Sequence, residues 1–132
     1  MKTDFICPKC GGHLSVGGSV ILSAINDKGE AGIVLLSPHL GDYSKILHPS
    51  FKINDGSKID FFCPMCRMSL TATDIHENIV HLVMIDELSE KHDVYFSRIE
   101  GEFCTYKISE HKIETFGNAS ENYEKYFMTR HI

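Results

Sequence analysis

The chain has 132 residues, of which 42% are hydrophobic. A chain of this length can bury roughly two-thirds of its unfolded surface, so we expect one globular domain whose core does not depend on a metal for its size alone. The formal net charge is −5, from 13 basic and 18 acidic side chains without blocks of like charge. This balance argues against nucleic acid and anionic membranes as partners, because phosphate repels a net-negative protein at long range.

No apolar run in the sequence has the length of a signal peptide or a membrane span. The longest apolar stretches, such as Gly32 to Leu36, are far shorter than the roughly 18 residues that cross a bilayer. We therefore expect a cytoplasmic protein with no membrane contact. In a reducing compartment, cysteines spaced C-x-x-C are metal ligands or redox centres more often than structural disulfides.

The first half of the chain is predicted to hold short β-strands separated by turns. β-branched and alternating apolar residues place these strands at residues 13–16, 19–25, 31–36 and 58–62. Asn26 to Gly29 is a strong turn signal, so the two strands around it are predicted to form a hairpin. Residues 37–54 contain Pro38, Pro49 and only brief apolar pairs, which predicts a long loop with little regular structure.

The second half is predicted to be an antiparallel β-meander that ends in a helix. Its strands are expected at residues 79–86, 94–99, 103–108 and 113–116, with a polar turn over 89–93. Alternation places Cys104, Tyr106 and Ile108 on the core face of their strand. Beyond the two cysteine pairs described below, we identify no internal repeat.

A C-terminal helix is predicted from a capping pattern followed by an aromatic stripe. Asn118, with Glu121 three residues later, resembles a capping box. Tyr123, Tyr126 and Phe127 then share one helical face, which we expect to dock onto the sheet.

The motif that carries chemistry is a C-P-x-C sequence that occurs twice. Cys7-Pro8-Lys9-Cys10 and Cys63-Pro64-Met65-Cys66 each place two sulfurs on a tight turn, where backbone N–H groups can donate to thiolates. Two such turns supply four soft ligands in a tetrahedron, which Zn²⁺ accepts at about 2.3 Å per bond. We therefore predict a metal site formed by Cys7, Cys10, Cys63 and Cys66.

The segments Cys7 to Gly12 and Cys63 to Cys66 resemble the knuckles of zinc-ribbon and rubredoxin-like proteins. The resemblance covers about a dozen residues and implies metal ligation by the four cysteines, with either structural zinc or one iron for electron transfer. Rubredoxins usually have glycine after the second cysteine of each knuckle. Gly11 fits this pattern and Arg67 departs from it, although Arg67 and Lys9 can offset the formal −2 charge of a Zn(Cys)₄ centre.

Three weaker features are interpreted as structural. Cys104 is expected to be a buried, inert thiol, with His111 near it only in sequence. The eight histidines are interpreted as scattered surface residues, although His39 and His48, with Asp42, offer an alternative second metal site. The loop from Ser37 to Tyr43 is interpreted as a cover over the sheet edge, with a functional role as the alternative.

The expected fold is mainly β: a zinc ribbon, an antiparallel β-meander and a C-terminal helix. We treat residues 1–132 as one domain, with a possible subdivision into 1–69 and 70–132 near Leu70 to Asn78. The expected function is a small zinc-ribbon binding or adaptor module with a protein partner. The alternatives are electron transfer through Fe(Cys)₄ and an enzyme whose site involves Cys104 or the loop from His39 to His48; no catalytic residues are assigned, and the oligomeric state is left open.

Overall fold

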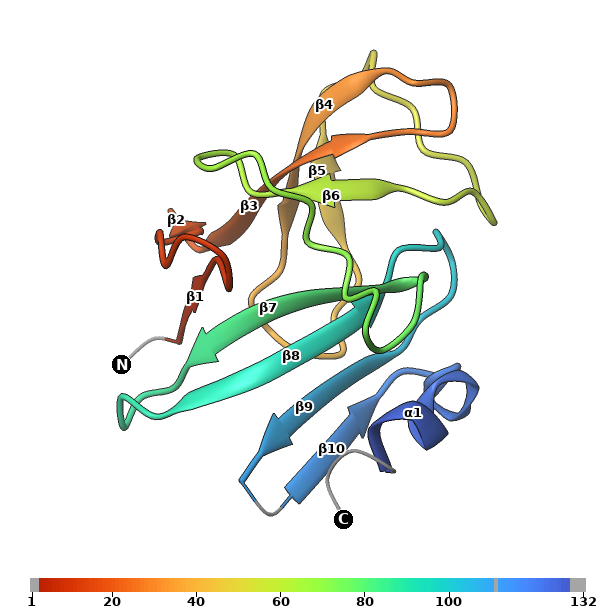
Figure 1. Cartoon of the computed structure of the whole chain (residues 1–132). Coiled ribbons are helices and arrows are strands. Elements are labelled where there is room, and N and C mark those ends of the chain that lie inside the picture. The colour runs from red at the N-terminus through yellow and green to blue at the C-terminus, as the bar shows by residue number, and fades with distance from the viewer. Residues whose placement is uncertain (1–2, 111, 129–132) are drawn as a thin grey trace.

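The computed structural model describes residues 3–110 and 112–128, and it is mainly β, as predicted (Figure 1). Two five-stranded antiparallel sheets pack on each other, and the C-terminal helix lies against one of them. The strands and helices are β1 (Asp4–Ile6), β2 (Ser15–Val16), β3 (Ser19–Ile25), β4 (Ala31–Leu36), β5 (Lys45–Leu47), β6 (Asp60–Phe62), β7 (Ile79–Ile85), β8 (Lys91–Ser97), β9 (Thr105–Ser109), β10 (Lys112–Phe116), a 3-10 turn η1 (Ser120–Asn122) and α1 (Glu124–Met128).

Sheet A has the strand order β1-β7-β8-β9-β10, and sheet B has the order β2-β3-β4-β5. Strand β6 also pairs with β3, beyond the end of β2. The predicted hairpin and the predicted β-meander are both present. Among the described residues, no helix is long and apolar enough to cross a membrane.

The structure contains an internal duplication, so our expectation of no repeat beyond the cysteine pairs was wrong. Strands β1, β3, β4 and β5 of the first repeat correspond to β6, β7, β8 and β9 of the second. The pairing registers match: Leu35 lies opposite Ile46 as Tyr95 lies opposite Tyr106. The first repeat covers residues 4–47 and the second covers residues 60–107.

The two hairpin turns have the same hydrogen bonds in both repeats. Asn26 and Asp86 each accept, through Oδ1, the backbone N–H groups two and four residues further along the chain, at 2.9–3.0 Å. Gly29 (φ 79°) and Ser89 (φ 64°) both take the left-handed backbone that the turn requires. Such matching of backbone detail indicates two copies of one supersecondary unit.

The repeats exchange strands. Strand β1 of the first repeat pairs with β7 of the second, and β6 of the second repeat pairs with β3 of the first. A reciprocal contact of this kind is what an approximate two-fold axis generates. The segments before the two knuckles therefore lie in different sheets.

The shared core lies between the two sheets and contains equivalent residues from both repeats. Alternation along each strand directs one set of side chains into this core. Its equivalent pairs are Phe5 with Phe61, Leu14 with Leu70, Val20 with Val80, Leu22 with Leu82, Ala24 with Met84, and Val34 with Val94. A second cluster lies on the other face of sheet A, where Tyr106 and Phe127 stack with ring centroids 4.5 Å apart.

Three local expectations need correction. The segment over 37–54 contains a strand, β5, because its register continues the sheet beyond β4. Strand β8 begins at Lys91, where it pairs with Ile85 across the turn. The capping box is absent: α1 begins only at Glu124, and Ala119, which precedes η1, has no side-chain cap and instead donates its N–H to the Phe103 carbonyl at 2.9 Å.

Two other expectations agree with the structure. Cys104, Tyr106 and Ile108 are buried, and Tyr123 and Phe127 are buried against sheet A. The division of the chain into one domain or two remains a prediction.

Candidate metal centre and a neighbouring pocket

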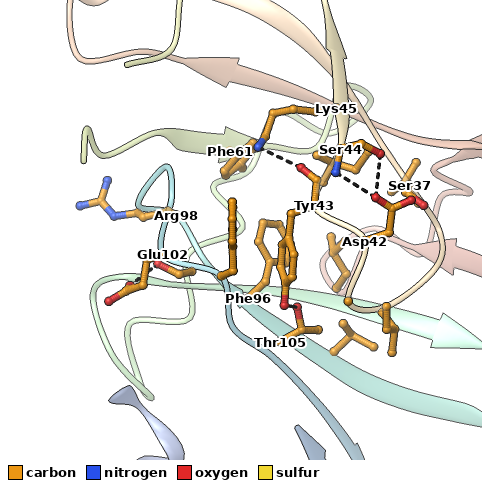
Figure 2. Close-up of a pocket in the computed structure, with 18 of the residues that line it drawn as sticks. Ser37, Asp42, Tyr43, Ser44, Lys45, Phe61, Phe96, Arg98, Glu102 and Thr105 are labelled. Carbon is orange, nitrogen blue, oxygen red and sulfur yellow. Dashed lines mark hydrogen bonds between the residues drawn. The ribbon is translucent and has the colours of Figure 1, made fainter. Parts of the chain in front are cut away.

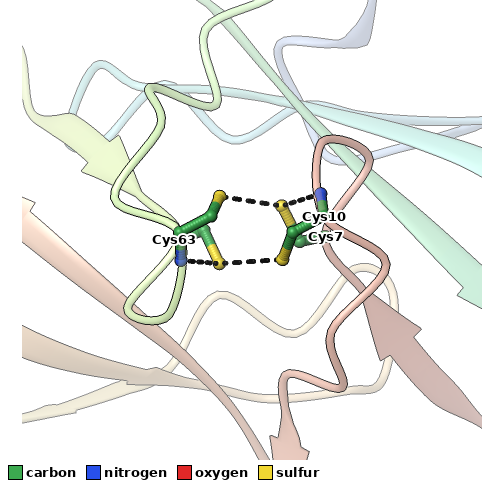
Figure 3. A group of neighbouring side chains, drawn as sticks. Cys7, Cys10 and Cys63 are labelled. Atoms are coloured by element: carbon green, nitrogen blue, oxygen red, sulfur yellow. Dashed lines mark hydrogen bonds between the residues drawn. The ribbon is translucent and has the colours of Figure 1, made fainter.

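The four predicted cysteines lie close together, and the two knuckles face each other (Figure 3). The Sγ atoms of Cys7 and Cys66 are 3.8 Å apart, and those of Cys10 and Cys63 are also 3.8 Å apart. In a tetrahedron with bonds of about 2.3 Å to zinc, neighbouring sulfurs are separated by about 3.8 Å. A disulfide would need about 2.05 Å. The arrangement is thus compatible with a metal ion held by four sulfurs.

Backbone N–H groups converge on the buried sulfur of each knuckle. Cys7 Sγ accepts the N–H groups of Lys9 at 3.2 Å and Cys10 at 3.5 Å. Cys63 Sγ accepts those of Met65 and Cys66, both at 3.4 Å. These donors stabilise negative charge on sulfur, so the turns are arranged to favour thiolates.

Arg67 takes the backbone conformation for which glycine was expected. Its φ is 65°, against 76° for Gly11 at the equivalent position. Each residue donates its N–H to the carbonyl of the first cysteine in its knuckle, Cys63 or Cys7, at 2.9 Å. The second knuckle therefore has the same geometry as the first, and its lack of glycine introduces strain without changing the turn.

The electrostatics of the cluster oppose four bare thiolates. Burial raises the pKa of the Cys7 thiol to about 12. Burial also opposes ionisation of Cys63, but the N–H groups of Cys66 and Met65 hold the pKa of that thiol at about 7. Four thiolates at these separations would repel one another strongly, so full ionisation requires a bound cation.

The first and the second cysteine of each knuckle differ in exposure. Cys7 and Cys63 are buried, whereas Cys10 is exposed and Cys66 is partly exposed. The contacts Cys7–Cys66 and Cys63–Cys10 are exchanged by the two-fold relation between the repeats. The candidate centre therefore lies where the two repeats meet.

The other candidate residues are not assembled into comparable sites. Within residues 3–110 and 112–128, His39 and His48 belong to no group of metal-ligating side chains, and both are exposed. Cys104 is fully buried, as predicted, and burial raises the pKa of its thiol to about 11. His111 lies outside the described residues.

A further group of potential ligands, Asp86, Glu90 and His92, was not predicted. His92 Nε2 lies 2.7 Å from Asp86 Oδ2, and its Nδ1 lies 2.8 Å from Ser109 Oγ. Because both ring nitrogens already have partners, this group is explained as a hydrogen-bonded network that fixes the β7–β8 turn.

A pocket of about 90 Å³ lies between the repeats, lined by residues 36–45 and 96–105, except Pro38 and Cys104, together with core side chains (Figure 2). The rings of Phe61 and Phe96 form part of its apolar wall, and the Lys45–Glu100 ion pair, at 2.9 Å, lies beside it. Tyr43 stacks on Phe103, with ring centroids 4.7 Å apart. The loop from Ser37 to Tyr43 thus forms part of a pocket.

The second loop of this pocket was missed by sequence reasoning. Tyr43 and Phe103 are equivalent positions of the duplication, and so are Gly41 (φ 92°) and Gly101 (φ 90°). The sequence contained a signal for this second loop. A serine is followed four residues later by a glycine, an acidic residue and an aromatic residue, and this pattern starts at Ser37 and again at Ser97.

Comparisons with known proteins assign no family to this chain. No family model matches it, and neither a curated protein nor a solved structure matches it. The functional argument therefore depends on the geometry described above.

Proposed function

We propose that Cys7, Cys10, Cys63 and Cys66 bind one structural Zn²⁺ and that the folded chain acts as a protein-binding module. The observation that carries the metal assignment is the pair of 3.8 Å sulfur separations, which match the edge of a zinc–thiolate tetrahedron. Four protein ligands complete the coordination of zinc and leave no open position for substrate. This favours a structural role over a catalytic one.

The proposed zinc ion joins the two repeats. Each knuckle belongs to a different repeat, and the cross-knuckle sulfur contacts are equivalent. Structural zinc binds with an apparent free energy of roughly 10–16 kcal/mol in small domains, which is comparable with the 5–15 kcal/mol stability of a typical domain. Loss of the ion is therefore expected to unfold the region where the repeats meet.

The metal assignment is tested by elemental analysis and thermal unfolding of the purified chain. We expect about one equivalent of zinc, with metal and cooperative unfolding both lost in Cys7→Ser and Cys63→Ser. Cys104→Ser is the matched control, because Cys104 is a buried cysteine away from the cluster, and it is expected to keep the metal. A wild-type chain that folds without any metal would overturn the assignment.

A second candidate function is electron transfer by iron at the same site. The observation that favours it is the exposure of Cys10, which places one sulfur at the surface, where an electron can leave or enter. Arg67 no longer argues against it, since its φ matches that of Gly11. A red chromophore with about one equivalent of iron would select this function over structural zinc.

The partner proposed for the module is a protein that inserts an apolar side chain into the inter-repeat pocket. The pocket volume, about 90 Å³, is smaller than the roughly 150 Å³ cavity that holds benzene in an engineered protein, so it suits one short side chain. The net charge of −5 disfavours nucleic acid. The enzyme alternative has less support, because Cys104 is buried and its pKa is raised. A reducing, cytoplasmic location remains part of the proposal.

A photo-crosslinker at His39, an exposed residue beside the pocket, tests the partner. The matched control carries the crosslinker at Glu87, an exposed residue of the β7–β8 turn. We expect a protein adduct that forms at position 39 and is absent at position 87. Adducts with nucleic acid, or equal adducts at both positions, would refute this partner class.

A further inference from the structure

The outer face of sheet B, defined here by Val16, Ile21, Ile33, Leu35 and Ile46, is apolar; three of these side chains are exposed, and Ile21 and Leu35 are partly exposed. Strand alternation points these side chains away from the shared core. Val16 is 62% exposed, Ile33 is 47% exposed and Ile46 is 64% exposed. Ile21, Leu35 and Ile46 form one cross-strand row over β3, β4 and β5. A contiguous apolar face of this kind marks an interaction site.

The duplication provides an internal comparison for this face. Val16 corresponds to Ala72, and Ile46 corresponds to Tyr106. Ala72 is 7% exposed and Tyr106 is fully buried, because the C-terminal segment packs over them. Phe127 of that segment stacks on Tyr106. In the second repeat, the positions that correspond to Val16 and Ile46 are thus covered by the chain itself.

Among the described residues, the rest of the outer face of sheet A carries polar side chains and no strongly exposed apolar one. His81 and Asp93 occupy the positions that correspond to Ile21 and Ile33, and His81 Nε2 lies 2.8 Å from Asp93 Oδ1. The uncovered apolar side chains of this face, Ile6, Val83 and Ile85, are each only partly exposed, unlike Ile33 and Ile46 of sheet B. Sheet B has isoleucine at these two positions, Ile21 and Ile33, and no segment of the described residues covers them. This contrast indicates that another chain covers the outer face of sheet B.

The charge of the outer face of sheet B indicates which kind of partner binds it. The outward positions of β2 to β5 are apolar, serine or alanine, and the charged outward residue of the neighbouring strand β6, Asp60, is paired with Arg98 at 2.6 Å. The apolar side chains of this face form no ion pairs with a charged partner. The face can meet its own copy across a two-fold axis without opposing like charges, despite the net charge of −5 on each chain.

We infer that the protein is a homodimer in which the outer face of sheet B packs on the same face of a second copy. The two faces stack as sheets about 10 Å apart. The row Ile21–Leu35–Ile46 of each copy forms the apolar centre of the interface. This inference does not depend on the identity of the metal or on the pocket.

Sedimentation equilibrium of the full metal-containing chain tests the inference, over concentrations from about 1 to 200 µM. The wild type is expected at twice the 14.9 kDa of one chain. Ile33→Asp introduces the residue that the second repeat carries at the equivalent position, so the strand tolerates it. It should weaken dimerisation by at least about ten-fold, because two copies then bury or oppose carboxylates. Ile46→Glu is a second variant with the same expectation.

Leu88→Glu is the matched control, because Leu88 is 79% exposed but lies on the β7–β8 turn. It should dimerise like the wild type. Circular dichroism and metal content establish that each variant is folded. A wild type of single-chain mass at every concentration would overturn the inference, even if a different protein binds this face. A dimer that persists unchanged in both folded variants would overturn it as well.

Discussion

Replacing Arg67 by glycine should stabilise the second knuckle. Arg67 has a φ of 65°, and left-handed backbone costs a residue with a Cβ roughly 1–2 kcal/mol. Glycine avoids this cost but loses about 0.5–1 kcal/mol more conformational entropy on folding. The net gain from the backbone is therefore about 1 kcal/mol, or about a five-fold change in the folding equilibrium.

The charge of Arg67 must be separated from its backbone, because an arginine beside an anionic centre also contributes electrostatically. We therefore compare Arg67→Gly with Arg67→Ala, both of which remove the charge. Denaturant unfolding of the metal-saturated chain should show the glycine variant more stable by about 1 kcal/mol. Gly11→Ala should lose about as much, because a Cβ there meets no atom within 4 Å and adds only backbone strain. Equal stability of the two Arg67 variants would refute the reasoning.

Three further outcomes are expected. Gly117→Ala should lower the free energy of unfolding by about 2–4 kcal/mol, because φ is 93° and the new Cβ would collide with the Phe103 carbonyl; Gly56→Ala, which meets no neighbour, should cost only about 1 kcal/mol in the same denaturant titration. Burial opposes ionisation of Glu102, but hydrogen bonds from surrounding side chains lower its pKa below 4.5. The ionised carboxylate therefore stabilises the fold above pH 4.5, and this contribution is lost as the pH falls through the depressed pKa. Glu102→Gln should reduce the loss of stability on acidification below pH 4.5. An unchanged acid profile would contradict the assignment. Cys104 should resist thiol reagents until the protein unfolds, since burial raises its pKa to about 11; rapid labelling of the native protein would contradict its burial.

The candidate metal centre was predictable because its information is local. Two C-P-x-C turns specify their own geometry, and four soft ligands need only be brought to one point. The hairpins were also predictable, since Asn26 to Gly29 is a turn signal and alternation marks the flanking strands. The weaker turn at Asp86 places serine at the left-handed position, and the sequence prediction started β8 too late for that reason.

The strand exchange was not predictable by the same reasoning. Pairing of β1 with β7 joins segments far apart in the chain, and neither segment contains a local signal for its partner. The duplication was hidden because the similar residues are few and scattered, such as Leu14 with Leu70 in the core and Tyr43 with Phe103 in the pocket loops. Most outward positions diverged, as Ile21 and His81 show, although Ile25 and Ile85 are identical. Strand-by-strand reasoning tests each segment for its own propensity and does not compare one half of a chain with the other.

The duplication changes the role that a metal at the four cysteines would have. In an isolated knuckle pair, the ion would close one turn onto another. Here each knuckle follows a strand that has already crossed into the sheet of the other repeat. The ion would thus hold both exchanged strands, β1 and β6, in place at the point where the two repeats meet. Removal of the metal should therefore release both exchanged strands and unfold the region where the repeats meet, which is why Cys7→Ser and Cys63→Ser are expected to lose cooperative unfolding together with the metal.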